Sequence, residues 1–240
     1  MATPMFIVTG FLDSGKTTMI KDTLMEQEWI EPGLTLLLLC EEGEEEYPEE
    51  YLKEKNMAVL KIEEFDQLNT VFFKNCERNY HPAQIIIEYN GMWKLEDLLS
   101  IRYPRSFELQ GVYSTVNGTT LDMYLMNMRN MLMEQLTESE LIVVNRCADG
   151  VNRSGFRRAL KVQNPMAQLI FEDMQGKIIE PSEEDLPYDV KGDKIVLDDV
   201  GMWMHMIIRN YICIKKSTSK DRSSARRECR TICSFRSERS

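Results

Sequence analysis

One octapeptide constrains the fold of this chain more than any other feature. Residues 10–17 read GFLDSGKT and match the pattern G-x-x-x-x-G-K-[ST]. The apolar run 5–9 before it predicts a strand, and residues 18–25 after it predict a helix. A glycine-rich loop in this context binds phosphate, because its backbone N–H groups and the positive end of the helix dipole face one anion. The sequence therefore predicts a phosphate-binding loop.

The residues of this loop have distinct expected roles. We expect Lys16 to reach the β- and γ-phosphates of a nucleotide and to act in catalysis, and Thr17 to ligate Mg²⁺. The glycines let the backbone wrap closely around the anion, so that N–H groups of residues 13–18 point at it. The predicted binding set is Gly10, Asp13, Ser14, Gly15, Lys16, Thr17 and Thr18.

Apolar runs and helical patterns alternate over the first 175 residues. This alternation is typical of an α/β protein with a mostly parallel sheet and helices on both faces. We therefore predict the fold of a P-loop NTPase. The expected strands are 4–9, 33–40, 57–61, 83–89, 108–115, 139–145 and 166–171, and the expected helices are 16–28, 48–55, 63–78, 93–101, 118–136 and 152–162.

Composition divides the chain into three regions. Residues 1–175 form the expected P-loop domain, and residues 176–200 read as a linker and the start of a truncated C-terminal region, with one more strand at 194–197. Residues 201–240 are basic and serine-rich, and we expect them to be disordered or a non-native ending, such as one left by a reading-frame change. An arm that binds nucleic acid or an acidic partner is the alternative.

Charge and hydropathy exclude several classes of protein. Residues 1–200 hold 19 basic and 36 acidic residues, against 10 and 3 in residues 201–240, so we expect no nucleic-acid binding by residues 1–200. No run approaches the ~20 apolar residues of a membrane helix, and the first strand leaves no room for a signal peptide, which predicts a cytoplasmic protein without a membrane span. The six cysteines form no C-x-x-C pair, which argues against a zinc ribbon.

Two carboxylates follow predicted strands. Glu88 ends the run Ile85–Ile87, and at the carboxyl edge of a parallel sheet it would hold Mg²⁺ or orient an attacking water as a catalytic group. Glu41 opens an acidic run where a switch segment would cover the γ-phosphate, and there it would bind Mg²⁺. Carboxylates that are simply solvated are the alternative at both places.

A third strand end carries candidates for base recognition. Residues 141–144 are followed by Asn145, Arg146 and, three positions later, Asp149. This order resembles the N-K-x-D element of guanine-binding proteins, in which the Asp accepts hydrogen bonds from the base. Arg146 replaces the Lys, and the Asp comes one position late, so a bulge in the loop is needed to bring Asp149 to guanine.

The expected helix 118–136 is unusually rich in methionine. A core helix with adaptable filling is the simplest interpretation, because a stripe at helical spacing runs along it. A partner-binding face and a soft-metal thioether site are the alternatives. The stripe is Leu121, Leu125, Met128, Leu132 and Gln135/Leu136, and the remaining methionines are Met123, Met126, Met131 and Met133.

Three motifs together resemble the CobW/HypB/UreG family of P-loop GTPases, and most of all its CobW branch. Residues 8–18 are close to the branch's T-G-F-L-x-x-G-K-T-T, and Glu88-x-x-Gly91 matches its E-x-x-G. Glu41-x-Gly43-Glu44 resembles its N-E-x-G-E segment, with Cys40 in place of Asn. The resemblance covers about residues 4–175.

The resemblance implies a GTPase that handles a metal ion such as Zn²⁺ or Co²⁺, through homodimers or docking on a client metalloprotein or transporter. The chain departs from the family in four ways. It lacks the branch's C-x-C-C metal motif, and we expect the branch's β-rich C-terminal domain to be missing or replaced. It also carries Asp13 where Gly is usual and Asn117 where the T-V-V-D segment has Asp.

These observations lead to one main hypothesis and two alternatives. The main one is a Mg²⁺-dependent, CobW-like GTP-binding protein with slow GTP hydrolysis, linked to metal handling. The second is a nucleotide-responsive interaction module without significant turnover that serves a transporter or metalloprotein. The third is a small-molecule kinase, although the sequence lacks the arginine-rich lid typical of such enzymes.

Overall fold

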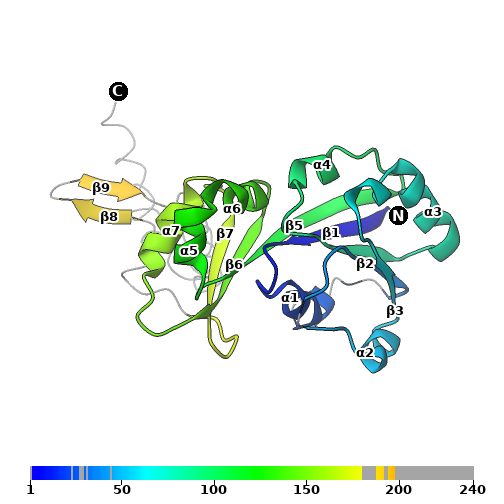
Figure 1. Ribbon diagram of the computed structural model, residues 1–240, viewed down its shortest axis with the longest axis horizontal. Coiled ribbons are helices and arrows are strands. Elements are labelled where there is room, and N and C mark those ends of the chain that lie inside the picture. Colours follow the sequence, from blue (N-terminus) through cyan, green and yellow to red (C-terminus); the bar gives the residue numbers. More distant parts are fainter. Residues whose placement is uncertain are drawn as a thin grey trace, which may run out of the picture. The chain divides into compact units, whose positions relative to one another are not determined.

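The computed structural model describes residues 2–22, 24–26, 30, 32–43, 45–179, 188–191 and 194–197. The chain divides into two compact units, Met1–Leu186 and Pro187–Ser240 (Figure 1). Within the described part of the chain, no helix has both the length and the apolarity needed to cross a bilayer.

A seven-stranded, all-parallel sheet forms the centre of the first unit, with strand order β3-β2-β4-β1-β5-β6-β7. Each expected strand of this sheet is present to within two residues at either end. The predicted P-loop NTPase fold is confirmed. The strands are β1 (Thr3–Thr9), β2 (Thr35–Leu39), β3 (Met57–Lys61), β4 (Gln84–Glu88), β5 (Phe107–Asn117), β6 (Leu141–Cys147) and β7 (Gln168–Asp173).

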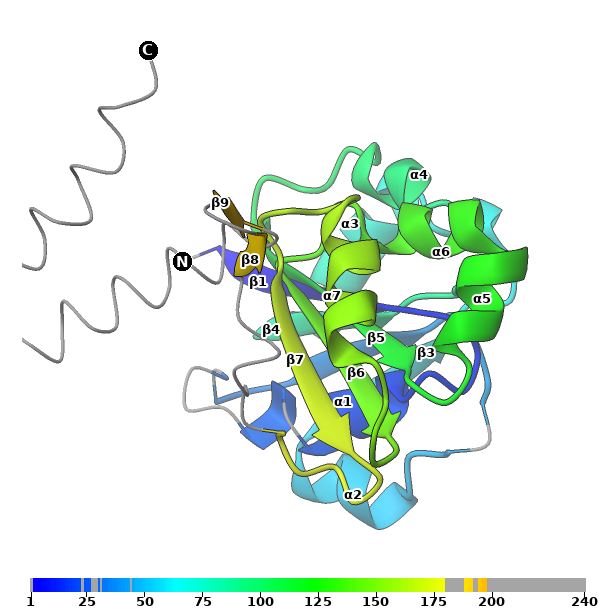
Figure 2. The same ribbon diagram turned by 90° about the vertical axis from the view of Figure 1, so that its left-hand side faces the viewer.

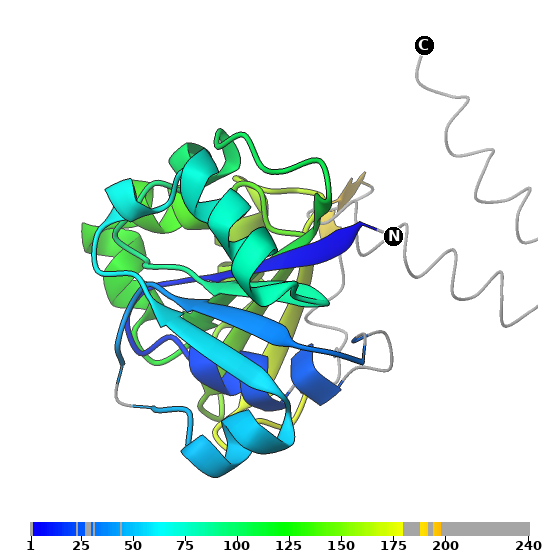
Figure 3. The same ribbon diagram turned by 90° about the vertical axis from the view of Figure 1, so that its right-hand side faces the viewer.

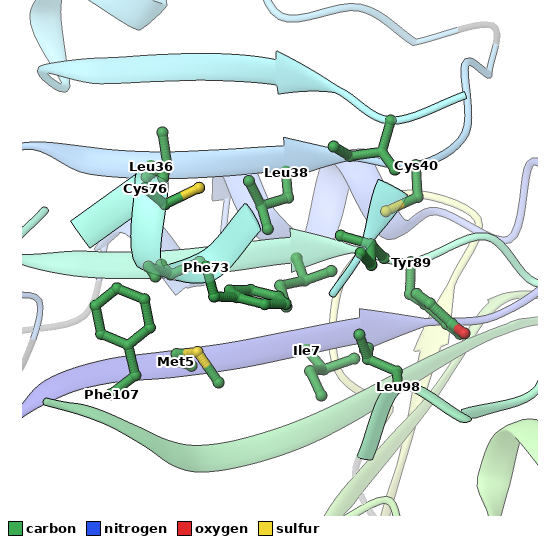
Figure 4. Close-up of a cluster of buried hydrophobic side chains, with 14 of the residues drawn as sticks. Met5, Ile7, Leu36, Leu38, Cys40, Phe73, Cys76, Tyr89, Leu98 and Phe107 are labelled. Carbon is green, nitrogen blue, oxygen red and sulfur yellow. The ribbon is translucent and has the colours of Figure 1, made fainter. Parts of the chain in front are cut away.

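The central strands are apolar on both faces, as a parallel sheet covered on both sides requires. Successive side chains of a strand point to opposite faces, so Met5 and Ile7 of β1 pack into one cluster while Phe6 and Val8 pack into another. The first cluster contains Phe73 and Leu98, which belong to helices on its side (Figure 4). The core is therefore two apolar layers separated by the sheet.

Helices cover the two faces unequally (Figures 1 and 3). α1 and α2 pack on one face, through Met19, Ile20 and Leu52. The remaining helices supply buried side chains to the cluster of Met5 and Ile7, or to a third cluster that contains Val116, Ile142 and Val144; Figure 2 views these helices from the side of β7. The helices are α1 (Lys16–Asp22), α2 (Glu49–Glu54), α3 (Thr70–Tyr80), α4 (Leu95–Leu99), α5 (Leu121–Asn127), α6 (Arg129–Leu136) and α7 (Arg153–Lys161), with short 3₁₀ turns η1 (Leu24–Glu26) and η2 (Phe65–Gln67).

Three expected helices differ from the observed ones in extent. The helix expected at 16–28 ends at Asp22, and the one expected at 63–78 begins as a 3₁₀ turn before α3 starts behind the N-cap Asn69. The helix expected at 118–136 is divided in two, because Met128 leaves helical geometry at φ −133° and ψ 30°. Each half then buries its own apolar residues: Leu121 in α5, and Leu132 with Leu136 in α6.

The described part of the second unit is an antiparallel hairpin of β8 (Tyr188–Lys191) and β9 (Lys194–Leu197). β9 is the strand expected at 194–197, whereas β8 lies where the sequence predicts a linker. The basic tail, 201–240, lies outside the described residues.

Candidate functional site

The phosphate-binding loop follows β1 at the carboxyl edge of the sheet and leads into α1. Three of its residues have positive φ: Gly10 at 139°, Asp13 at 56° and Gly15 at 96°. Asp is among the few side chains that tolerate the left-handed region. Asp13 therefore adopts a conformation that glycine takes up most readily.

Close backbone contacts explain two glycines of the motifs. A Cβ atom on Gly10 would lie 2.3 Å from the Thr115 carbonyl oxygen, and one on Gly91 would lie 2.2 Å from the Gly10 carbonyl oxygen. The chain that leaves β4 thus crosses directly over the start of the loop. The three-residue spacing from Glu88 to Gly91 places the carboxylate and this crossing at the same edge of the sheet.

Lys16 is buried, with 4% of its surface exposed, and its ammonium group has three acceptors. The Nζ atom donates to the carbonyls of Gly10 at 2.9 Å and Phe11 at 3.0 Å, and to Glu41 Oε2 at 2.6 Å. The first two contacts hold the side chain against its own loop. The third brings together two residues that the sequence predicts to be functional.

Thr17 and Glu88 are also in direct contact. The Thr17 hydroxyl donates to Glu88 Oε1 at 2.7 Å, and the Tyr47 hydroxyl donates to Oε2 at 2.5 Å. Burial raises the pKa of the Glu88 carboxyl, although both hydrogen bonds and the charge of Lys16 act to lower it. Burial, followed by the charge of Glu88, raises the pKa of Tyr47, so its hydroxyl remains a proton donor.

The end of β6 is tied to the loop by two side chains. Asn145 Nδ2 donates to the Ser14 carbonyl and Arg146 Nη1 donates to the Asp13 carbonyl, both at 2.7 Å. Pairing with β7 shifts register between Val144 and Cys147, and Arg146 has φ 51°. The backbone is therefore irregular at Arg146, whose guanidinium contacts the loop. Whether Asp149 reaches guanine, as the sequence predicts, stays a prediction.

A cavity of about 410 Å³ lies over the loop. It brings together predicted residues from the loop with Glu41, Glu88 and Arg146, which come from three different strand ends. Its lining is Leu12, Asp13, Gly15, Lys16, Thr17, Thr18, Glu41, Gly43, Glu45, Glu88, Asn117 and Arg146.

Other predicted residues lie outside that lining. The Ser14 side chain of the loop is buried, and its hydroxyl shares a 2.7 Å hydrogen bond with that of Thr115; Gly10 is buried beside it. Asn145 holds the loop through its hydrogen bond to the Ser14 carbonyl. Asp149 is exposed and lines a different cavity, of about 460 Å³, formed by residues 148–154 and Ile179.

Sequence reasoning missed two residues that support the site. Tyr47 contacts Glu88. The sequence feature that could have indicated it is an aromatic residue within an acidic run. Gln135 accepts a hydrogen bond from the Thr9 hydroxyl and donates to the Trp93 carbonyl at 2.8 Å. The sequence feature that could have indicated Gln135 is its position as a single amide within the apolar stripe of the Met-rich helix.

The methionines of α5 and α6 divide between core and surface. Met133 is buried, whereas Met123 is 48% and Met126 77% exposed. Across the described residues, there is no group of three or more His, Cys, Asp or Glu side chains placed to hold a metal ion.

The residues that build the site lie within a segment that matches one known family. A sequence profile described as CobW/HypB/UreG, nucleotide-binding domain, matches residues 4–171, which is more than half of the chain. The chain belongs to the CobW/HypB/UreG family. None of the curated proteins matches its sequence.

Solved structures show the same fold at low identity. A Zn(II)-bound triple mutant of the YjiA GTPase is 18% identical, with a TM-score of 0.52 over 75% of this chain and 60% of that one. The hydrogenase maturation factor HypB from Archaeoglobus fulgidus is 19% identical, with a TM-score of 0.51 over 72% of this chain and 82% of that one. The chain thus spans less than two thirds of the YjiA protein.

Proposed function

We propose that this CobW/HypB/UreG family member is a Mg²⁺-dependent GTP-binding protein that hydrolyses GTP slowly. One observation carries the proposal: Lys16, Thr17 and Glu88 line a single cavity over a glycine-bent loop, at the carboxyl edge of a parallel sheet. Ligands of α/β proteins bind at this edge.

The donor set at the loop fits a magnesium nucleotide. The Thr17 hydroxyl and the carboxylates of Glu88 and Glu41 are oxygen ligands of the kind that Mg²⁺ prefers, and they line the same cavity as Lys16. Bound there, Mg²⁺ would neutralise phosphate charge. Lys16 and the N–H groups of residues 13–18 would hold the phosphates, and Glu88 would orient the attacking water.

The proposed preference for guanine rests on the end of β6. Arg146 and Asn145 fix this strand end to the phosphate loop, and the segment with Asp149 follows it in a different cavity. We propose that Asn145 and Asp149 recognise the base. Asp149 is exposed and available for such a contact.

Titration with labelled GTP and ATP, in the presence of Mg²⁺, tests the proposal. We expect GTP to bind more tightly than ATP, and Lys16→Ala to weaken GTP binding roughly a hundredfold, because a buried charge partner of the phosphate is lost. Lys53→Ala is the control, since Lys53 is 77% exposed and pairs with Glu49 at the surface of α2. Equal binding by wild type and Lys16→Ala would disprove the assignment.

The exposed Met123 and Met126 favour a second candidate, a nucleotide-responsive module that binds a partner without significant turnover. A phosphate-release assay separates the two. Steady release from GTP that is abolished in Glu88→Gln supports the enzyme, whereas tight GTP binding without release supports the module.

A further inference from the structure

Two polar side chains of the connection from β2 to α2 contact Lys16 and Glu88, which are central to the proposed nucleotide site. Glu41 lies near its start and contacts Lys16, and Tyr47 lies near its end and contacts Glu88. The two contacts involve different partners, yet they come from one short stretch of chain.

The first contact uses the remaining capacity of Lys16. An ammonium group has three N–H donors, and the carbonyls of Gly10 and Phe11 take two of them. Glu41 accepts the third at 2.6 Å, with its side chain 11% exposed. An anionic oxygen therefore occupies the position on Lys16 that a phosphate oxygen would need.

The second contact occupies a carboxylate oxygen of Glu88 that would otherwise be available to a cation. Thr17 and Tyr47 each donate to one of its carboxylate oxygens. The Tyr47 hydroxyl donates to Oε2, so it competes with any cation for that oxygen. Glu88 is buried, with 3% of its surface exposed, and this hydrogen bond offsets part of the cost of removing it from water.

We propose that Glu41 and Tyr47 form an inhibitory clasp, which occupies Lys16 and Glu88 until a magnesium nucleotide displaces both. The inference rests on the proposed nucleotide site and adds its regulation. A closed clasp reduces apparent affinity by the fraction of molecules that are open, so a site open in one molecule in ten binds about tenfold more weakly than an open one.

The Glu41 end is tested with GDP in EDTA, where only contacts with the phosphates count. Glu41→Gln should tighten GDP binding about tenfold, because the amide does not compete by charge for Lys16. Glu42→Gln is a matched control that removes the same charge one residue away, where Glu42 pairs with Lys61 at the surface. Binding by Glu41→Gln that equals or falls below that of Glu42→Gln would overturn the proposal.

The Tyr47 end is tested with GTP and Mg²⁺. Tyr47→Phe should lower the Mg²⁺ concentration needed for half-maximal GTP binding severalfold, because Glu88 loses a competing donor. Tyr51→Phe is its control, since the Tyr51 hydroxyl donates instead to the Lys21 carbonyl at 3.1 Å. An unchanged or higher Mg²⁺ requirement in Tyr47→Phe, relative to Tyr51→Phe, contradicts the clasp.

A third measurement needs no nucleotide and separates the clasp from the proposed function. Acetylation of Lys16 by an N-hydroxysuccinimide ester, followed by peptide mass spectrometry, should be several times faster in Glu41→Gln than in Glu42→Gln. Equal rates would count against the clasp whether or not the protein binds GTP. Absence of nucleotide binding in every variant, with faster acetylation in Glu41→Gln, would refute the nucleotide site and leave the Lys16–Glu41 contact in place.

Discussion

At the scale of single residues, the site depends on backbone positions that tolerate no added atoms. Gly91 lies against the Gly10 carbonyl, and Asp13 tolerates the left-handed geometry that the loop requires there. The sequence predicted the phosphate loop because its motif is local. It could not predict the contact of Tyr47 with Glu88, because the two residues are 41 positions apart and meet only when β2 and β4 pair.

Gly91→Ala should destabilise the protein by roughly 1–3 kcal/mol, because the new methyl group would force the two chain segments apart. Urea unfolding followed by circular dichroism measures this change. Gly150→Ala is the comparison: nothing lies within 4 Å of its added Cβ, so only the strain of φ +78° remains, about 1 kcal/mol. Gly91→Ala that is no less stable than Gly150→Ala would argue against the close crossing.

Burial raises the pKa of the Cys76 thiol from 9.0 to about 11. Thiolate is the reactive form, so at pH 8 its population is about a hundredfold lower than in an unfolded chain. We expect iodoacetamide to modify Cys76 slowly in native protein and rapidly in urea, and the native rate to keep rising above pH 9. Mass spectrometry of the Cys76 peptide follows the reaction, and rapid native labelling at pH 8 would contradict its burial.

At the scale of helices and strands, local signals located most elements. Apolar runs such as Leu36–Leu38 and Ile85–Ile87 predicted central strands, because parallel strands buried on both faces have continuous apolar sequence. The break at Met128 was not predictable, since no glycine or proline marks it. Its position depends on how α5 and α6 each pack against the sheet, and that is a tertiary effect.

Asn69→Ala should destabilise the protein by about 1 kcal/mol, because the Asn69 side chain accepts hydrogen bonds from the N–H groups of Val71 and Phe72 at the start of α3. Denaturant titration gives the free energy of unfolding. Asn75→Ala, at an exposed position inside the same helix, should be neutral or slightly stabilising. A loss of stability in Asn75→Ala as large as that in Asn69→Ala would show that capping is not the cause.

At the scale of the whole first unit, stability should follow the strand order. β4 and β1 pair with neighbours on both sides, whereas β3 and β7 lie at the two edges of the sheet. We expect amide hydrogen exchange to be slowest in β1 and β4 and faster in the two edge strands. Exchange measured by mass spectrometry checks this gradient. Uniform protection across the sheet would contradict it.

The lining of the cavity over the loop has a consequence for the order of binding events. Asp13, Glu41, Glu45 and Glu88 outnumber the two cations, Lys16 and Arg146. A polyphosphate without a bound cation would therefore approach a site of its own sign, and added salt would ease its entry by screening that repulsion. The same surface would repel a nucleotide with a bound metal ion much less, because the cation cancels part of the phosphate charge. If the proposed nucleotide site is correct, its acidic lining should disfavour the free nucleotide more than the metal-bound form.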